Sequence, residues 1–402
     1  MKAYERLLRY AAVDSQSDEE ASGTPSTVKQ FDMTRLLKED MEAIGFEQVY
    51  TDEYAYAYGF LPATPGREQD PVIGLIAHID TALDFTGAGV RPILHHNYDG
   101  GDVSLGESGK VLSPKQFPDL LSCVGQTLIT TDGTTLLGAD DKAGIAEILA
   151  ACERLLAEKR SHGAVAVCFP PDEEIGHGAA LLDLERLGAD FAYTVDGDSI
   201  EKVNCETFNA AAARFEIHGV SVHPGSAKDT MINASLLAME INAMLPADEI
   251  PANTSDYEGF FHLTDMRGDV SFAELKYIVR DHDSAHFSSR KEKLREIEQK
   301  MNARYGMGTV TLTLRDQYRN MAEILQTQPE IVERAKAAIL KTGLAPVIAP
   351  VRGGTDGSQL SFRGLPCPNL GTGGAAFHGP FEHITAEHMD QMVEILLNIL
   401  CD

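Results

Sequence analysis

The sequence predicts an α/β fold, with a mixed sheet flanked by helices and a smaller α+β domain inserted into it. Apolar strand-like runs alternate with helical periodicity over the first half of the chain. The pattern changes at about residue 207 and resumes at about residue 320. With 402 residues, 43% of them hydrophobic, the chain can bury a full core and is long enough for two domains.

The first half predicts a sheet between layers of helices. Apolar residues at helical spacing predict a helix over 30–44, and the continuous apolar run 72–77 predicts a strand that is covered on both faces. The other elements expected here are strands within 47–60, a helix over 142–158, a strand over 164–169, a helix over 178–187 and a strand over 191–195. Such alternation is typical of α/β proteins.

The middle of the chain predicts a separate small domain. The segment 309–314 alternates polar and apolar residues as a half-buried strand does, and 285–304 is a charged helix. The expected order is strand 214–218, helix 231–244, strand 270–280, helix 285–304 and strand 309–314. This β-α-β-α-β order suggests a sheet with helices on one face.

The α/β pattern then returns, with a helix over 329–342, strands near 346–351 and 366–370, and a helix over 386–400. Candidate ligands occur on both sides of the insert, so the catalytic domain must be discontinuous if they share one site. We therefore predict a catalytic domain formed by 1–206 and 320–402, with 207–319 as the insert and a candidate lid.

The composition of the chain argues against several classes of protein. The net charge of −27, from 61 acidic and 34 basic residues, should repel nucleic acids and anionic membranes. Six scattered cysteines without C-x-x-C spacing indicate neither a zinc knuckle nor a disulfide framework. No apolar signal region opens the sequence, and no run of 18 apolar residues occurs. We expect a cytoplasmic protein that binds neither nucleic acid nor membrane.

Five short segments with acidic or histidine residues each lie next to a predicted strand end, and ligands bind at the carboxyl ends of strands in open α/β sheets. They are 78–80, 138–142, 172–174, 195–198 and 378–379. Carboxylates and imidazoles from such segments could hold two divalent metals about 3.5–4 Å apart and activate water against an amide bond. Hydrolysis is therefore the first hypothesis.

Each segment also has a structural interpretation. His78 could be a core histidine beside a turn aspartate, Asp140 could begin a helix with an acidic first turn, and 172–174 could be a solvated acidic loop. The pair 196 and 198 could belong to a common turn, and His378 could be a surface histidine in a glycine-rich loop. The placement of all five segments next to predicted strand ends favours a metal site over five separate structural roles.

Longer strings support this hypothesis. They are 77–81, 125–133, 137–146, 171–174, 193–197, 223–225, 352–357, 364–370 and 378–379. In these strings the chain resembles the family of dinuclear metallopeptidases (M20) that includes aminoacylase and bacterial carboxypeptidases, and within it the tripeptide aminopeptidases. The resemblance spans nearly the whole chain. It implies a zinc-peptidase-like catalytic domain, an inserted lid that usually also mediates dimerisation, and release of the N-terminal residue from short peptides.

The resemblance also implies residue roles. Asp140 would bridge two zinc ions per subunit, with cobalt or manganese as possible alternatives. The remaining metal ligands would be His78 and Asp196 for one ion, and Glu174 and His378 for the other. Glu173 would be the general base, and Asp80 would orient His78.

The resemblance also suggests substrate-binding groups. His223 would stabilise the oxyanion, while Arg280 and Arg352 are candidates for the peptide carboxylate, although either arginine could instead form a structural salt bridge. The chain departs from the family pattern at Asp198, a candidate partner for the substrate amine, and in the segment after His378, where His383 could mimic a ligand. The alternatives are another amidohydrolase of this family (dipeptidase, carboxypeptidase or deacylase) and a non-catalytic metal-binding scaffold.

Overall fold

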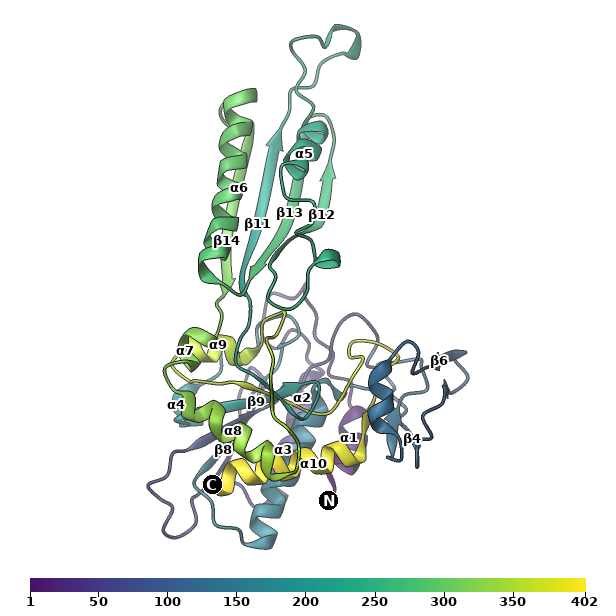
Figure 1. Ribbon diagram of the computed structural model, residues 1–402, viewed down its shortest axis with the longest axis vertical. Coiled ribbons are helices and arrows are strands. Elements are labelled where there is room, and N and C mark those ends of the chain that lie inside the picture. The colour runs from purple at the N-terminus through teal and green to yellow at the C-terminus, as the bar shows by residue number, and fades with distance from the viewer. The chain divides into compact units, whose positions relative to one another are not determined.

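The computed structural model describes all residues, 1–402, and divides into two compact units (Figure 1). Unit 1 comprises Met1–Cys205, Met321–Ala349 and Thr355–Asp402, and unit 2 comprises Glu206–Asn320 and Pro350–Gly354. The predicted insert, 207–319, differs from the longer part of unit 2 by one residue at each end. The prediction did not include 350–354, which joins unit 2 through contacts such as the bond from the Val351 amide to the Glu206 carbonyl.

Unit 1 is built on an eight-stranded mixed sheet, which confirms the predicted fold class. Its strands, in spatial order, are β1 (Glu47–Thr51), β2 (Ala57–Leu61), β8 (Val165–Phe169), β3 (Ile73–Ile76), β9 (Phe191–Gly197), β16 (Asn369–Gly371), β10 (Lys202–Asn204) and β15 (Val347–Ile348). The four strands β8, β3, β9 and β16 run parallel to one another. Their carboxyl ends therefore meet at one edge of the sheet.

Helices cover both faces of this sheet. Successive residues of a strand point to opposite faces, so Val165, Val167 and Phe169 of β8 enter a large apolar cluster, and Ala166 and Cys168 enter a smaller one. The large cluster contains side chains from α1 (Ala3–Ala11), α2 (Gln30–Ile44), α3 (Ala139–Glu158), α8 (Pro329–Lys341) and α10 (Ala386–Cys401). The smaller one contains side chains from α4 (Leu184–Leu187) and α9 (Asp356–Phe362). No helix is both long and apolar enough to span a bilayer.

Smaller elements complete unit 1. The strands β4 (Ile93–His95), β7 (Leu128–Thr130) and β17 (Ile384–Thr385) form a three-stranded sheet, and β5 (Val103–Leu105) pairs with β6 (Lys110–Leu112). A short helix, α7 (Ala322–Leu325), precedes α8, and a 3-10 turn occurs at Pro118–Cys123, while two further 3-10 turns, Pro224–Ser226 and Pro251–Asn253, belong to unit 2. We predicted none of these, since strands of two or three residues leave almost no periodicity.

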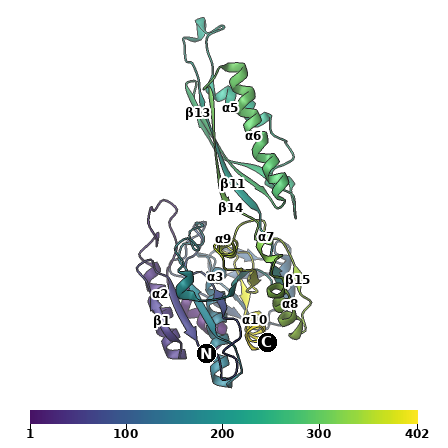
Figure 2. The same cartoon turned by 90° about the vertical axis from the view of Figure 1, so that its left-hand side faces the viewer.

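Unit 2 has one antiparallel sheet in the order β12-β13-β11-β14, with two helices packed on one face (Figure 2). Its elements are β11 (Asn209–His218), α5 (Ala234–Ala243), β12 (Phe260–Gly268), β13 (Phe272–Asp281), α6 (Ser284–Tyr305) and β14 (Val310–Tyr318). The predicted order omitted β12. This edge strand buries Phe260 and Phe261 and then becomes largely exposed, so its sequence has no sustained alternation.

The predicted helix over 178–187 is wrong for residues 178–183, because only Leu184–Leu187 is helical. The side chain of Asp183 accepts the amide of Arg186 and so caps a helix that begins at 184. Upstream, the Tyr56 hydroxyl donates to the carbonyl of Gly178 and accepts the amide of Leu181. Tertiary contacts thus replace the helical hydrogen bonds of this segment.

Candidate metal centre

The five predicted ligands come from five segments of unit 1. His78 follows β3 and Asp196 lies in β9, and these two strands are parallel neighbours. Glu174 follows β8, Asp140 lies at the start of α3, and His378 lies in the loop after β16. The structure brings all five together.

Asp140 lies between the two histidines. Its Oδ1 is 3.0 Å from Nε2 of His78, and its Oδ2 is 3.1 Å from Nε2 of His378. A carboxylate that directs one oxygen to each imidazole has the arrangement required of a bridging ligand.

Each histidine also faces a second carboxylate. Nε2 of His78 is 3.4 Å from Oδ1 of Asp196, and Nε2 of His378 is 3.2 Å from Oε2 of Glu174. The two sets that result, His78–Asp140–Asp196 and His378–Asp140–Glu174, share Asp140. His78 is 2% exposed and His378 is 44% exposed, so the second set lies nearer to solvent.

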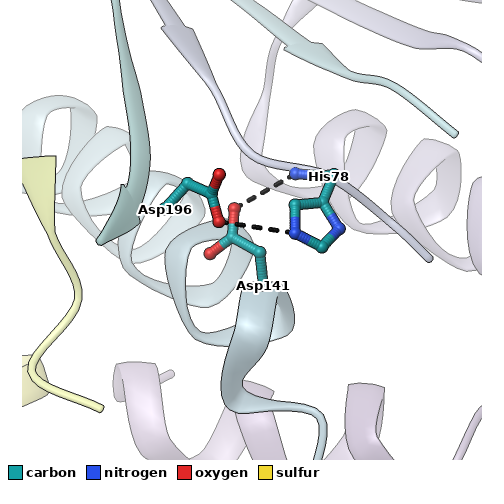
Figure 3. Close-up of side chains that lie close together, drawn as sticks. All are labelled: His78, Asp141 and Asp196. Carbon is teal, nitrogen blue, oxygen red and sulfur yellow. Dashed lines mark hydrogen bonds and ion pairs between the residues drawn. The ribbon is translucent and has the colours of Figure 1, made fainter. Parts of the chain in front are cut away.

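Asp141, which the sequence analysis did not propose as a ligand, lies close to His78 and Asp196 and could serve a metal with them (Figure 3). Its oxygens are already used by the backbone, since Oδ2 accepts the amide of His78 at 3.1 Å and Oδ1 accepts that of Gly144 at 3.2 Å. Asp140 has no such backbone partners for its oxygens. Asp141 therefore fits a supporting role better than a bridging one.

Asp80 contacts both sides of the site. Its Oδ1 is 3.3 Å from Nδ1 of His78, and its two oxygens accept the amides of Glu173 and Glu174 at 3.0 and 3.2 Å. Because Asp80 is fully buried, these contacts fix the imidazole and the start of the glutamate loop in one arrangement.

The chemistry of the donors fits divalent cations. Burial raises the pKa of Glu174 to about 8 and that of Asp196 to about 6, and the charge of Asp140 adds to both shifts. The hydrogen bond to Asp140 raises the pKa of His378 to about 9. Oε1 of Glu174 is buried without a hydrogen-bond partner. Bound cations would compensate this buried negative charge.

Glu173 precedes the proposed ligand Glu174 in the sequence but is not itself a proposed ligand. Burial raises its pKa well above the ordinary value, and the charges of Asp196 and Asp356 raise it further. A raised pKa makes a carboxylate more basic, as a general base for water requires.

Two further residues were missed by sequence reasoning. Glu382 is buried, and its oxygens accept the amides of Leu137, Gly138 and Asp140. Asp356 is also buried, and a Cβ added at Gly178 would lie 2.2 Å from its Oδ2. The sequence signal for Asp356 was its position inside the string 352–357, which resembles the family, whereas Glu382 lies outside all of these strings.

The candidate substrate groups lie in unit 2, outside the cluster described above. His223 is exposed, and its Nδ1 accepts the amide of Gly225. Arg280 donates to the carbonyls of Ala211 and Val279 and to Oε1 of Gln317. The guanidinium of Arg352 donates to several oxygens of one nearby segment, namely the carbonyls of Thr254, Asp256 and Glu258 and the hydroxyl of Thr254. Both arginines thus make structural contacts within unit 2.

The two departures noted in the sequence have other partners. Oδ2 of Asp198 is 2.7 Å from Nζ of Lys202, and its carboxylate is half exposed, so it makes a surface ion pair. Nε2 of His383 is 2.7 Å from Oδ2 of Asp119. Neither residue belongs to the cluster around Asp140.

Known proteins resemble the chain over its full length. "Peptidase T" of Clostridium perfringens (strain 13 / Type A) is 50% identical over 400 residues, which cover 99% of this chain and 98% of that protein. "Peptidase T" of Alkaliphilus oremlandii is 48% identical over 399 residues and 98% of each chain.

Solved structures share the fold. The aminopeptidase PepT of Bacillus cereus matches with a TM-score of 0.78 at 23% identity, covering 99% of this chain and 97% of that one. A dinuclear metal-binding peptidase of family M20 from Bacillus subtilis matches with a TM-score of 0.64 at 14% identity, covering 99% and 97%. The profile of the peptidase family M20/M25/M40 matches residues 132–402. The chain therefore belongs to the peptidase family M20/M25/M40.

Proposed function

We propose that the protein is a two-metal aminopeptidase that releases the N-terminal residue of short peptides, tripeptides above all. The observation that carries this proposal is the position of Asp140, with one oxygen directed to each of two histidines. The relatives named peptidase T, about half identical over the whole chain, support the choice of substrate.

The ligands proposed for the metals are His78, Asp140 and Asp196 for one ion, and His378, Asp140 and Glu174 for the other. Zinc is the proposed metal because it binds imidazole nitrogen and carboxylate oxygen at such sites. Cobalt and manganese are the alternatives. When bound, the metals supply a Lewis acid that polarises the scissile carbonyl and increases the acidity of water.

Residues of the chain would carry out the proton transfer, hold the ligands in place and bind the substrate. Glu173 takes the proton from the attacking water and delivers it to the leaving amine, which balances the hydrolysis. Asp80 keeps His78 and the backbone of Glu173 in place through the contacts described above. His223 is proposed to stabilise the oxyanion, and Arg280 and Arg352 to bind the terminal carboxylate, each by its resemblance to the family pattern.

The proposal is tested by measuring amino-acid release from di-, tri- and tetrapeptides by the metal-loaded protein. Matched N-acetylated and C-terminally amidated tripeptides measure the need for each free end. A free tripeptide should be the best substrate. Preference for the acetylated peptide would instead identify a deacylase, and equal rates on dipeptides would contradict a tripeptidase.

The arginines can be tested with the same substrates. Arg352→Ala and Arg280→Ala should each cost about 1.5–3 kcal/mol in kcat/KM, as for a lost hydrogen bond to a charged group. The loss should be confined to substrates with a free carboxylate. An equal loss on the amide would assign the arginines to their structural contacts in unit 2.

Assembly and location form a further part of the proposal. A homodimer through unit 2 is supported by Leu236 and Met239 of α5, which are each 60% exposed. Light scattering of Leu236→Glu should then report a monomer, and an unchanged dimer would reject this surface. A reducing compartment such as the cytoplasm is supported by the six cysteines, all of which are free thiols.

A further inference from the structure

Glu382 holds the backbone that presents Asp140. Its side chain is buried, with 1% exposed. Oε2 accepts the amides of Leu137 and Gly138 at 2.7 and 2.8 Å, and Oε1 accepts the amide of Asp140 at 3.0 Å. Three backbone donors on one carboxylate fix the turn before α3, because moving this turn would leave buried amides unpaired.

Glu382 also lies in the loop that supplies His378. Ala375 and His383 close this loop by exchanging backbone hydrogen bonds of 2.9 and 3.0 Å. The Glu382 side chain therefore joins the loop of His378 to the turn of Asp140, whose Oδ2 faces that same histidine at 3.1 Å.

The two proposed metal positions are thus supported differently. His78 and Asp196 are held by β3 and β9, which are hydrogen-bonded neighbours in the sheet. His378 lies in a loop at a φ of 64°, a left-handed conformation that is unfavourable for a residue with a side chain. Its distance from Asp140 depends on contacts between loops, and the Glu382 contacts connect its loop to the backbone of Asp140.

We propose that Glu382 is a positioning residue that sets the spacing between Asp140 and His378 and thereby the affinity of the His378–Glu174 metal position. The inference rests on the proposed two-metal function. Loss of Glu382 should weaken the ion at this position and leave the ion at the His78–Asp196 position nearly unchanged.

Glu382→Gln breaks one specific contact. The amide oxygen of glutamine can still accept the bonds from Leu137 and Gly138, but its NH₂ group then faces the amide of Asp140, donor against donor. Glu382→Asp keeps the charge and shortens the side chain, so it cannot reach all three amides. Glu387→Gln is the matched control, since Glu387 accepts the exposed amide of Thr127 at 2.7 Å.

The experiment is calorimetric titration of Co²⁺ into chelator-treated wild-type protein and the three variants, with visible absorption recorded at each step. Wild type and Glu387→Gln should bind two ions. Glu382→Gln should bind the first ion within about threefold of wild type and the second about 10–100-fold more weakly, the usual loss when an outer partner of a ligand is removed. Urea unfolding of the metal-free variants monitors the fold, and Glu382→Asp carries the test if the glutamine variant does not fold.

A second set of titrations shows which metal position loses affinity. In a His378→Ala background only the His78–Asp196 position remains, so adding Glu382→Gln should not weaken the remaining ion further. Two affinities equal to wild type in Glu382→Gln, or equal weakening of both ions, would overturn the inference. Wild-type protein that binds one ion would instead overturn the proposed two-metal function, so the two failures are distinguishable.

Discussion

Three adjacent carboxylates, Asp172, Glu173 and Glu174, have three different surroundings. Glu174 faces His378, and Glu173 is partly buried beside the charges of Asp196 and Asp356. Asp172 instead turns away, where its oxygens accept the Ser26 amide and hydroxyl and the Gln30 side-chain amide. The sequence could mark the triplet as a candidate site, but the partners of Asp172, Ser26 and Gln30, lie 146 and 142 residues away and leave no local signal.

The role of Glu173 separates chemistry from metal binding. Glu173→Gln keeps the size of the side chain and removes its basicity. It should retain metal content and fold while kcat falls by about 10²–10⁴, the scale expected for a general acid–base group. Metal analysis and single-substrate kinetics test this, and a metal-replete variant with near-normal turnover would exclude Glu173 as the base.

The environment of a second residue, Glu147, predicts that the free energy of unfolding depends on pH. Neither of its carboxylate oxygens has a hydrogen-bond partner, and burial raises its pKa well above the ordinary value. The unfolded chain loses this proton at about pH 4.3, before the folded protein does, so the group lowers stability as pH rises above that value.

Glu147→Met removes this loss of stability at high pH. The variant should be more stable than wild type, by a larger margin at pH 8 than at pH 5.5, when urea midpoints of metal-free protein are compared at each pH. The same margin at both values would show that the folded protein does not hold this proton.

At the scale of elements, ligands at strand ends were the part that sequence could predict. β3 and β8 are apolar runs of four and five residues, and β9 is largely apolar up to Val195, so the polar residues that come next could be assigned to one edge of the sheet. Segments held by tertiary contacts could not be assigned. The 178–183 turn had apolar residues at helical spacing, yet Tyr56 binds its backbone.

The glutamate loop supplies an element-scale prediction. Asp172→Asn removes one of the acceptor oxygens used by Ser26 and Gln30 and leaves a buried donor unpaired, so it should cost about 1–3 kcal/mol of stability in urea unfolding. It should also lower kcat, because the loop carries both glutamates. Asp183→Asn is the control, since asparagine caps a helix about as well as aspartate does. A loss no larger than that of the control would show that the network does not hold the loop.

For the whole molecule, the change of pattern near residues 207 and 320 indicated a discontinuous catalytic domain because the insert has its own periodicity. The sequence analysis did not assign residues 350–354 to the insert, since they join unit 2 through contacts with distant segments, such as those of Arg352 with 254–258. The candidate metal ligands could likewise be predicted from the sequence. The roles of Asp141 and Glu382, which hold the backbone of the site, could not, because they depend on hydrogen bonds between distant segments.

The central claim is that catalysis needs two metals around Asp140. The most direct measurement removes metal with a chelator and then titrates zinc or cobalt back while tripeptide hydrolysis and bound metal are followed together. Chelation should abolish hydrolysis, and activity should rise until two ions are bound per chain. Full activity with one tightly bound ion per chain would contradict the account.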